Sequence, residues 1–362
     1  MKKSAIWLIF PILILMSACG GESPTPILGC EPSARITPDC RFKNPEDIVL
    51  LPSGNAVLIS QFGAMDGSKS GNIAHYTLSD RNINILYPNE IEHTGGWGEP
   101  ECEVPDANAF SPHGIDLEQR DDGTWMLLVV NHGLRESIEF FEVESNRILT
   151  WRGCVEGPEN AYFNDVVGRP DGGFWVTHMM TKEDEGSEML KGYLFGSDTG
   201  FVYNWRQETG FEKVTGSDGP FPNGIEKSED ESFLFINMYL GNEVRKLDVQ
   251  SGRIVRTAPV AQPDNTTWSL DGESLLVASH TDSMTEMGPC QELIEGGCGF
   301  EFEIVALNPE DMSRRTILKH RGAPMGGATV ATDIGGALIL GSFAGDRIAQ
   351  VPVDMSYRVQ TE

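Results

Sequence analysis

One phrase recurs six times along this chain, and it constrains the fold more than any other feature. Each copy is a polar turn that ends in Gly or Asp, followed by apolar, β-forming residues. The copies are PSG-NAVLIS (52–60), DDG-TWMLLVV (121–130), PDG-GFWVTH (170–178), SED-ESFLFIN (228–237), LDG-ESLLVAS (270–279) and DIGG-ALILGS (333–342). Spacings of about 40 to 70 residues suit a four-stranded sheet with variable loops. We therefore expect an all-β, six-bladed β-propeller, because a β-sandwich or two barrels would not explain the repeat.

The N-terminal segment reads as a processing signal rather than as structure. Two lysines precede an apolar run, Ile6 to Met16, which is too short to span a membrane. The following Ser17-Ala18-Cys19 resembles the bacterial lipoprotein signal, in which the cysteine is lipidated; Met16 stands where that pattern most often has Leu. An ordinary secretory signal cut nearby is the alternative.

This interpretation divides the chain into three parts. Residues 1–18 are predicted to be a lipoprotein signal peptide, residues 19–40 the lipidated Cys19 and a tether, and residues 41–362 the propeller. The protein is then expected in the bacterial cell envelope, held to a membrane by the N-terminal lipid and facing the periplasm or the exterior.

The chain is strongly acidic, which excludes one class of partner. It carries 27 basic and 54 acidic residues, a formal net charge of −27. Such a surface repels phosphate backbones, so we expect no nucleic-acid partner. The charge is compatible with cation binding, although solubility and salt tolerance are the more general explanation.

The cysteine count predicts disulfides. Of the seven cysteines, six follow Cys19, an even number in a compartment that is expected to be oxidising. Six cysteines allow 15 pairings. Local proximity favours Cys30–Cys40 and Cys290–Cys298, which leaves Cys102–Cys154. None of the spacings is typical of a zinc site.

The segment Phe110–Val143 brings two histidines together. A turn at Arg120-Asp121-Asp122-Gly123 separates His113 from an apolar run that ends at His132, so the segment is predicted to be a β-hairpin. The midpoint between the histidines falls between Asp122 and Gly123. If the strands pair symmetrically about that midpoint, the histidines are cross-strand neighbours with Cβ atoms about 5 Å apart.

A second regularity precedes the repeated turns. Eight residues before the turn ends, four repeats have an oxygen-bearing side chain, namely Glu46, Asn164, Asn223 and Asp264. The second turn is two residues longer, and ten residues before Gly123 is His113. In the sixth repeat the corresponding residue is Ala328, which has no ligand atom. Because equivalent positions on the innermost strands of a propeller face its axis, we expect these five side chains to converge.

Oxygen donors without clustered thiols describe a hard-cation site, and neutral amide donors favour Ca²⁺ over Mg²⁺. The expected ligand set, which supplies at least five oxygens and two negative charges, is Glu46, Asn164, Asn223, Asp264 and Asn265. Asp47 and Asp165 follow two of these residues and point the other way, because adjacent strand residues alternate. They are predicted to form a second site, completed by a backbone carbonyl near Ile115. We therefore expect a central tunnel that holds two Ca²⁺ ions.

These phrases resemble the paraoxonase/arylesterase family of calcium-dependent lactonases, from about Asn44 to Val351. The residues that carry the resemblance are Pro45-Glu46-Asp47, Phe110-Ser-Pro-His-Gly-Ile115, Leu127-Leu-Val-Val-Asn-His132, Phe163-Asn-Asp165, Pro222-Asn-Gly-Ile225, Pro263-Asp-Asn265 with Ser279-His280, and Gly327-Ala-Thr-Val330. The combination of LLVVNH with PHGI is the most specific part.

The resemblance implies roles for these residues. The five-residue set would hold a catalytic Ca²⁺, whereas Asp47, Asp165 and the Ile115 carbonyl would hold a structural one. His113 and His132 match the family's histidine dyad, and His280 matches another active-site histidine. The implied activity is a carboxylic ester hydrolase for small lactones and aryl esters, in which Ca²⁺ polarises the carbonyl and the dyad activates water.

Some features depart from the family pattern. The chain has no cysteine near its C-terminus, so the animal enzymes' bridge between the chain ends cannot form, and a lipid anchor replaces their apolar N-terminal helix. The pocket-rim loops at Ala64–Asn72 and Thr281–Gly297 also differ, so substrate preference is the least transferable property. The sequence defines no oligomeric state.

Two other functions remain open. One is a sugar lactonase of the regucalcin/gluconolactonase type, which shares a Glu, Asn and Asp metal set but has no counterpart of the His113–His132 hairpin. The other is a calcium-stabilised propeller that acts as a binding module without catalysis.

Overall fold

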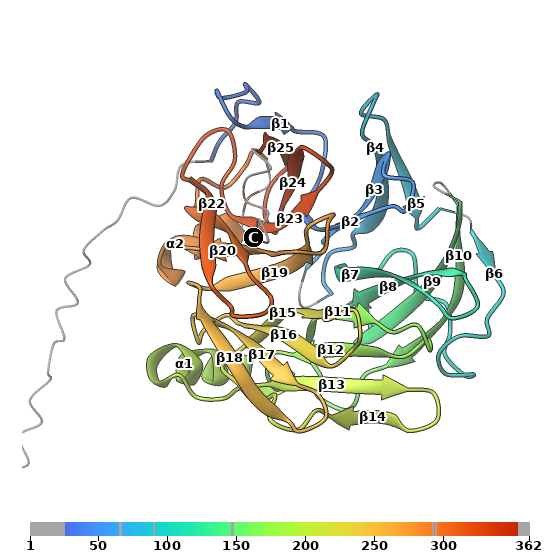
Figure 1. The fold of residues 1–362 in the computed structure, drawn as a ribbon. Coiled ribbons are helices and arrows are strands. Elements are labelled where there is room, and N and C mark those ends of the chain that lie inside the picture. The colour runs from blue at the N-terminus through green and yellow to red at the C-terminus, as the bar shows by residue number, and fades with distance from the viewer. Residues whose placement is uncertain are drawn as a thin grey trace, which may run out of the picture.

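The computed structural model describes residues 26–353 except residues 65–66, 90, 146–147, 292 and 294. Six sheets, antiparallel apart from one short edge strand, follow one another around a central axis, and in each the strand before the repeated apolar phrase is innermost (Figure 1). The predicted six-bladed β-propeller is therefore confirmed. The predicted signal peptide and Cys19 lie outside the described residues.

The first three blades are formed in chain order. Blade 1 contains β2 (Pro45–Leu50), β3 (Ala56–Gln61), β4 (Asn72–Thr77) and β5 (Ile83–Tyr87). Blade 2 contains β7 (Pro112–Gln119), β8 (Trp125–Asn131), β9 (Ser137–Ser145) and β10 (Ile148–Glu156), with the short β6 (Glu92–His93) added parallel to β10. Blade 3 contains β11 (Phe163–Gly168), β12 (Phe174–His178), β13 (Phe201–Arg206) and β14 (Gly210–Lys213).

The remaining three blades complete the ring. Blade 4 contains β15 (Pro222–Lys227), β16 (Phe233–Met238), β17 (Glu243–Asp248) and β18 (Arg253–Pro259). Blade 5 contains β19 (Pro263–Trp268), β20 (Leu275–His280), β21 (Phe302–Leu307) and β22 (Arg314–His320). Blade 6 contains β23 (Ala328–Asp333), β24 (Ala337–Ser342), β25 (Ile348–Pro352) and, from the other end of the chain, β1 (Thr37–Asp39).

The pairing of β1 with β25 closes the ring. Thr37 pairs with Gln350 and Asp39 with Ile348, so the N-terminal strand forms the outer edge of the last blade. Strand β1 lies within the segment predicted to be a tether (19–40), so the folded domain begins before the predicted boundary at residue 41. The reason is that three residues, TPD, are too few to show a strand period.

The repeated apolar phrases form the second strand of each blade. In β8 the run is almost wholly apolar because both faces of this strand are buried. Leu127 and Val129 pack in the core between blades 1 and 2, whereas Leu128 and Val130 pack in the core between blades 2 and 3. Each such side chain contributes about 1.5 to 3 kcal/mol when fully buried.

All three predicted disulfides are present, namely Cys30–Cys40, Cys102–Cys154 and Cys290–Cys298. The first encloses β1, and the second joins the segment between β6 and β7 to β10.

Within the described part of the chain, helices are confined to two loops that follow the second strand of a blade. The η1 turn (Lys182–Asp184) and α1 (Glu185–Phe195) follow β12, and α2 (Met284–Gln291) follows β20. Among the residues described, no helix has the length and apolar content needed to cross a membrane.

Candidate functional site

All six inner strands share a distortion at the same position. In β2, β7, β11, β15, β19 and β23, the ladder with the second strand shifts its register directly after the first paired residue. A β-bulge redirects the side chains beside it, and bulges are common next to functional sites. The residues that follow the first paired residue are Glu46, His113, Asn164, Asn223, Asp264 and Thr329.

Five of these six are the residues that the spacing of the sequence places on the axis. The sixth position was predicted wrongly: Ala328 is an ordinary ladder residue opposite Ser342, and Thr329 occupies the irregular position. Thr329 Oγ1 donates a 2.6 Å hydrogen bond to the backbone carbonyl of Glu46. Blade 6 therefore supports the strand that carries Glu46. The error arose because Thr329 lies seven rather than eight residues before Gly336, so the turn before β24 is one residue shorter than the count assumed.

The axial side chains present oxygen atoms that lack partners. Glu46 Oε2 and three amide oxygens, those of Asn164, Asn223 and Asn265, are buried and make no hydrogen bond. They come from four different blades. The amide nitrogens, in contrast, have neighbours: Asn265 Nδ2 donates to Glu46 Oε1 at 2.9 Å. Buried acceptors without donors are rare in folded proteins, so a group of four calls for a missing positive partner.

Burial also disfavours the ionised forms of the two carboxyl groups at this site, those of Glu46 and Asp264. Burial raises the pKa of Glu46 well above its ordinary value, and the neighbouring charges of Asp47, Asp264 and Asp165 raise it further. Burial raises the pKa of Asp264 to about 8. The nearest basic atoms are His113 Nε2, 3.8 Å from Glu46 Oε1, and His280 Nε2, 3.7 Å from Asp264 Oδ2.

The two histidines do not neutralise these carboxylates. Burial lowers the pKa of His113 well below its ordinary value, and it lowers the pKa of His280 to about 4. Neither histidine is therefore positively charged near neutral pH, and among the described residues no Lys or Arg side chain forms an ion pair with Glu46 or Asp264. Oxygen-only donors with two carboxylates fit a Ca²⁺ ion. Within the described residues, no group of three His, Cys, Asp or Glu side chains is arranged to hold a metal, because most of these donors are amides.

The predicted second set is arranged differently. Asp47 Oδ2 accepts a 2.8 Å hydrogen bond from the backbone N–H of Ile115 in the next blade, and Asp165 Oδ2 accepts one of 2.9 Å from Ile225. Both aspartates thus join neighbouring blades. Burial raises the pKa of Asp47 to about 7 and that of Asp165 well above its ordinary value. Two buried carboxylates fit a cation, and the bond from the Ile115 N–H does not engage the carbonyl of Ile115, which belongs to the next peptide unit and is the predicted third ligand.

His113 and His132 lie beside the axial donors. His113 Nδ1 is 3.1 Å from His132 Nε2, and the Phe62 ring lies 4.8 Å from the His113 ring between centroids. The predicted register was wrong, however. In β7 and β8, Ile115 pairs with Val129 and Pro112 with Asn131, so the histidines are not ladder partners. The bulge after Pro112 brings the rings together.

Some residues of the site were not predicted from the sequence. His132 Nδ1 lies 2.8 Å from Glu136 Oε1, and Lys182 Nζ lies 3.1 Å from Glu136 Oε2. The hydroxyl of Tyr239 lies 2.9 Å from His280 Nδ1. Glu136 lies in the short turn between β8 and β9, where its carboxylate can turn back toward the end of β8. This place in the sequence, four residues after His132, was the one signal from which a role for Glu136 could have been predicted.

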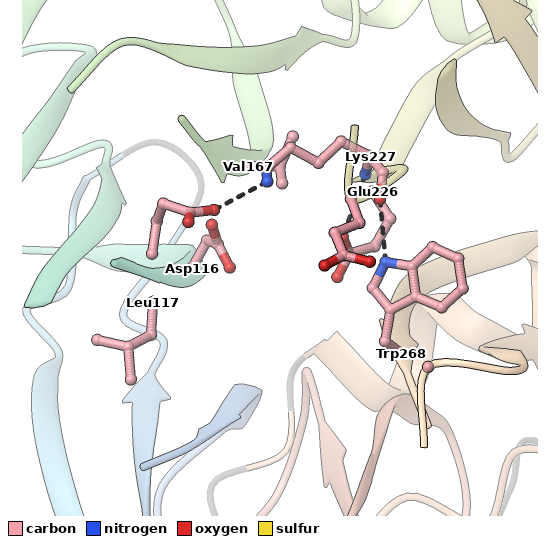
Figure 2. A pocket seen from close by; sticks show the side chains of 9 residues that line it. Asp116, Leu117, Val167, Glu226, Lys227 and Trp268 are labelled. Carbon is pink, nitrogen blue, oxygen red and sulfur yellow. Dashed lines mark hydrogen bonds and ion pairs between the residues drawn. The ribbon is translucent and has the colours of Figure 1, made fainter. Parts of the chain in front are cut away.

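Two cavities lie at opposite ends of the inner strands. One, of about 430 Å³, is lined by the dyad residue His132 together with Glu136, Lys182 and neighbouring loop residues. The other, of about 410 Å³, lies where β7 and β15 end. Figure 2 shows Asp116 on one side of it and Lys227 and Trp268 on the other. The first cavity adjoins the dyad, and it is the better candidate for a substrate entrance.

The fold and the axial donors define a six-bladed propeller with a polar centre. The family model described as "SMP-30/Gluconolactonase/LRE-like region" matches residues 118–278, a segment that extends from the end of β7 into β20. In sequence, the chain is 24% identical over 328 residues to serum paraoxonase/arylesterase 2 of Rattus norvegicus, covering 84% of this chain and 86% of that protein. The resemblance to the paraoxonase/arylesterase family is confirmed.

Solved structures show the same fold. A gluconolactonase from Xanthomonas campestris superposes with a TM-score of 0.52 at 15% identity, covering 91% of this chain and 95% of the other. A calcium-binding regucalcin from Agrobacterium tumefaciens superposes with a TM-score of 0.50 at 12% identity, covering 86% and 91%. Because the sequence identities are this low, the similarity to these structures shows the propeller fold alone.

Proposed function

We propose that this protein is a calcium-dependent carboxylic ester hydrolase that opens small lactones and cleaves aryl esters. One observation carries the proposal: buried, unpartnered oxygens of Glu46, Asn164, Asn223 and Asn265 lie beside a histidine pair. A carboxylate and amide cluster supports cation binding, and a nearby imidazole supports proton transfer. The similarity to serum paraoxonase/arylesterase 2 supports the same chemistry.

The residues would divide into two metal sites. The catalytic Ca²⁺ would be held by Glu46, Asn164, Asn223, Asp264 and Asn265. A structural Ca²⁺ would be held by Asp47, Asp165 and the carbonyl of Ile115. A bound Ca²⁺ supplies Lewis-acid stabilisation of negative charge on the carbonyl oxygen of the substrate.

The side chains supply the proton chemistry. His113 accepts the proton of the attacking water, and His132 orients His113 and shares the positive charge. The lowered pKa of His113 keeps its ring neutral and able to accept a proton near pH 7. His280, whose Nδ1 contacts the Tyr239 hydroxyl, lies beside Asp264 on the opposite side of the axis.

A sugar lactonase is the second candidate. The match of residues 118–278 to the SMP-30/Gluconolactonase/LRE-like region favours it. The contact between His113 and His132 favours the aryl ester and simple lactone hydrolase, because a pair of buried imidazoles serves to activate water.

Substrate panels separate these possibilities. We expect hydrolysis of phenyl acetate and of γ- and δ-lactones of increasing acyl-chain length, abolished by a chelator. Turnover of sugar lactones alone would support the second candidate. Complete inactivity, together with stability that depends on calcium, would support the calcium-stabilised binding module and contradict both hydrolase functions. In the cell, the predicted lipid on Cys19 would hold the enzyme at the envelope surface.

A further inference from the structure

A carboxylate extends the histidine pair into a chain of four polar groups. His113 Nδ1 lies 3.1 Å from His132 Nε2, and His132 Nδ1 lies 2.8 Å from Glu136 Oε1. Glu136 Oε1 also accepts a 2.7 Å hydrogen bond from the backbone N–H of Phe163, and Lys182 Nζ lies 3.1 Å from Oε2. The His132 side chain is fully buried, and that of Glu136 is only 8% exposed.

The partners of Glu136 keep its carboxylate ionised. Burial alone would raise the pKa of Glu136, but the charge and hydrogen bond of His132, the charge of Lys182 and the Phe163 N–H together hold it below the ordinary value. An ionised carboxylate accepts hydrogen bonds and donates none. The proton between Glu136 and His132 therefore resides on His132 Nδ1.

The proton on His132 Nδ1 determines which ring nitrogens of both histidines carry a proton when both rings are neutral. With Nδ1 protonated, a neutral His132 has a lone pair on Nε2, so the hydrogen bond between the rings must be donated by His113 Nδ1. His113 Nε2 is then unprotonated. This nitrogen is the atom that faces the axial site, 3.8 Å from Glu46 Oε1.

We infer that Glu136 is a positioning residue that sets the tautomers of both histidines, so that His113 presents a bare Nε2 to the attacking water. The inference rests on the proposed hydrolase function and deepens it. It also assigns Lys182 the role of holding the far oxygen of Glu136. In this way one turn between β8 and β9 and one loop of blade 3 orient a base in blade 2.

The proton transfers balance in this arrangement. The water O–H bond breaks as its oxygen bonds to the carbonyl carbon, and that proton goes to His113 Nε2. The Nδ1 proton of His113 can move to His132 Nε2, which places the positive charge next to the Glu136 carboxylate. When the ring C–O bond of the lactone breaks, the leaving alkoxide takes a proton back from His113 Nε2, and the original tautomers return.

Two substitutions separate the effect of the negative charge of Glu136 from the effect of its hydrogen-bond acceptor. Glu136→Gln keeps an oxygen for His132 and Phe163 but removes the charge, and we expect kcat to fall about 100-fold with KM within about 3-fold. Glu136→Met removes the acceptor as well, and we expect a fall of about 1000-fold. Glu208→Gln, which changes an exposed carboxylate in the turn between β13 and β14, is the matched control and should leave kcat unchanged.

Nitrogen NMR of the full-length protein labelled with ¹⁵N-histidine reads the tautomers directly. We expect wild-type His132 and His113 both protonated at Nδ1, with His113 Nε2 bare, and a mixture of tautomers in Glu136→Met. Bound calcium and the unfolding temperature are measured for each variant. Glu136→Asp should recover part of the activity lost in Glu136→Met, because it restores an ionised acceptor.

Three results would overturn the inference: a wild-type His132 that is unprotonated at Nδ1, unchanged kcat in both variants, or a loss of kcat that only follows loss of calcium or of folded protein. If the wild-type protein hydrolyses no ester or lactone, the proposed function fails, and the NMR spectrum alone decides the tautomer assignment.

Discussion

His113 Nδ1 lies 3.1 Å from His132 Nε2, although the two residues are not partners in the ladder between β7 and β8. The backbone N–H of His132 instead bonds to the carbonyl of Ser111. The approach of the rings therefore depends on the bulge at residues 113 and 114, which is packed tightly against blade 3. This dependence makes the bulge itself a target for mutation.

Gly114→Ala should disturb the site without changing any polar side chain. A Cβ at Gly114 would lie 2.6 Å from the Asn164 carbonyl oxygen and 2.6 Å from the Asp165 Cα, both in the neighbouring blade. We expect a loss of about 1 to 3 kcal/mol in the free energy of unfolding, together with reduced turnover. Gly186→Ala, where nothing lies within 4 Å, is the control. Equal stability of the two variants in urea would contradict the packing argument.

Removal of calcium should destabilise the protein. In the proposed calcium-bound protein, removal of the ion would leave the buried oxygens of Glu46 and its amide neighbours without a compensating charge. Excess ligand at about 100 times its Kd adds about 2.7 kcal/mol, so a chelator should lower the unfolding temperature by several degrees. Glu46→Gln should weaken calcium binding at least tenfold, whereas the exposed Glu212→Gln should not. An unfolding temperature that changes with neither chelator nor added calcium would exclude an axial ion.

His178 should make stability fall in acid. Burial lowers its pKa from 6.5 to about 4, so between these values the unfolded chain binds a proton that the folded chain does not. The free energy of unfolding therefore decreases as pH falls from 6.5 toward 4, by at most about 1.4 kcal/mol per pH unit. His178→Gln, which retains an acceptor for the Tyr162 N–H, should flatten this slope. Urea denaturation of both proteins at several pH values measures it, and parallel curves would refute the assignment.

Arg347 should anchor the N-terminal segment to blade 6. Its guanidinium is buried and donates to the carbonyls of Ile27, Gly29 and Pro324 at 2.7 to 2.9 Å. Arg347→Met leaves these acceptors unpaired, and we expect a loss of about 3 kcal/mol in the free energy of unfolding. Arg314→Met, which removes one exposed bond to a carbonyl, should change it by less than about 1 kcal/mol. Similar losses in both variants would show that the buried contacts add nothing.

The axial residues were predictable because they belong to a repeat. The same turn precedes the second strand of every blade, so counting back from it reaches Glu46, Asn164, Asn223 and Asp264 in turn. The count failed at Thr329, because the turn before β24 is one residue shorter than the others that were counted. Counting back from the turn therefore locates the axial residue correctly only where the turn has the same length as in the other blades.

Contacts between blades were not predictable in this way. Glu136 and Lys182 are 46 residues apart, and they meet because loops of blades 2 and 3 meet at one rim. Neither residue belongs to a periodic pattern. The closing strand β1 was missed for a similar reason, since its pairing with β25 joins the two ends of the described chain.

The most direct test of the central claim follows calcium and turnover in one sample. The purified protein is depleted of metal, and Ca²⁺ is then titrated back while δ-lactone hydrolysis and bound calcium are measured together, for wild type and for His113→Gln. We predict that wild-type activity disappears on depletion and returns in proportion to bound calcium. His113→Gln should bind calcium normally but turn over at least 100-fold more slowly. Lactone hydrolysis that persists in the metal-free protein, or full activity in His113→Gln, would contradict the account.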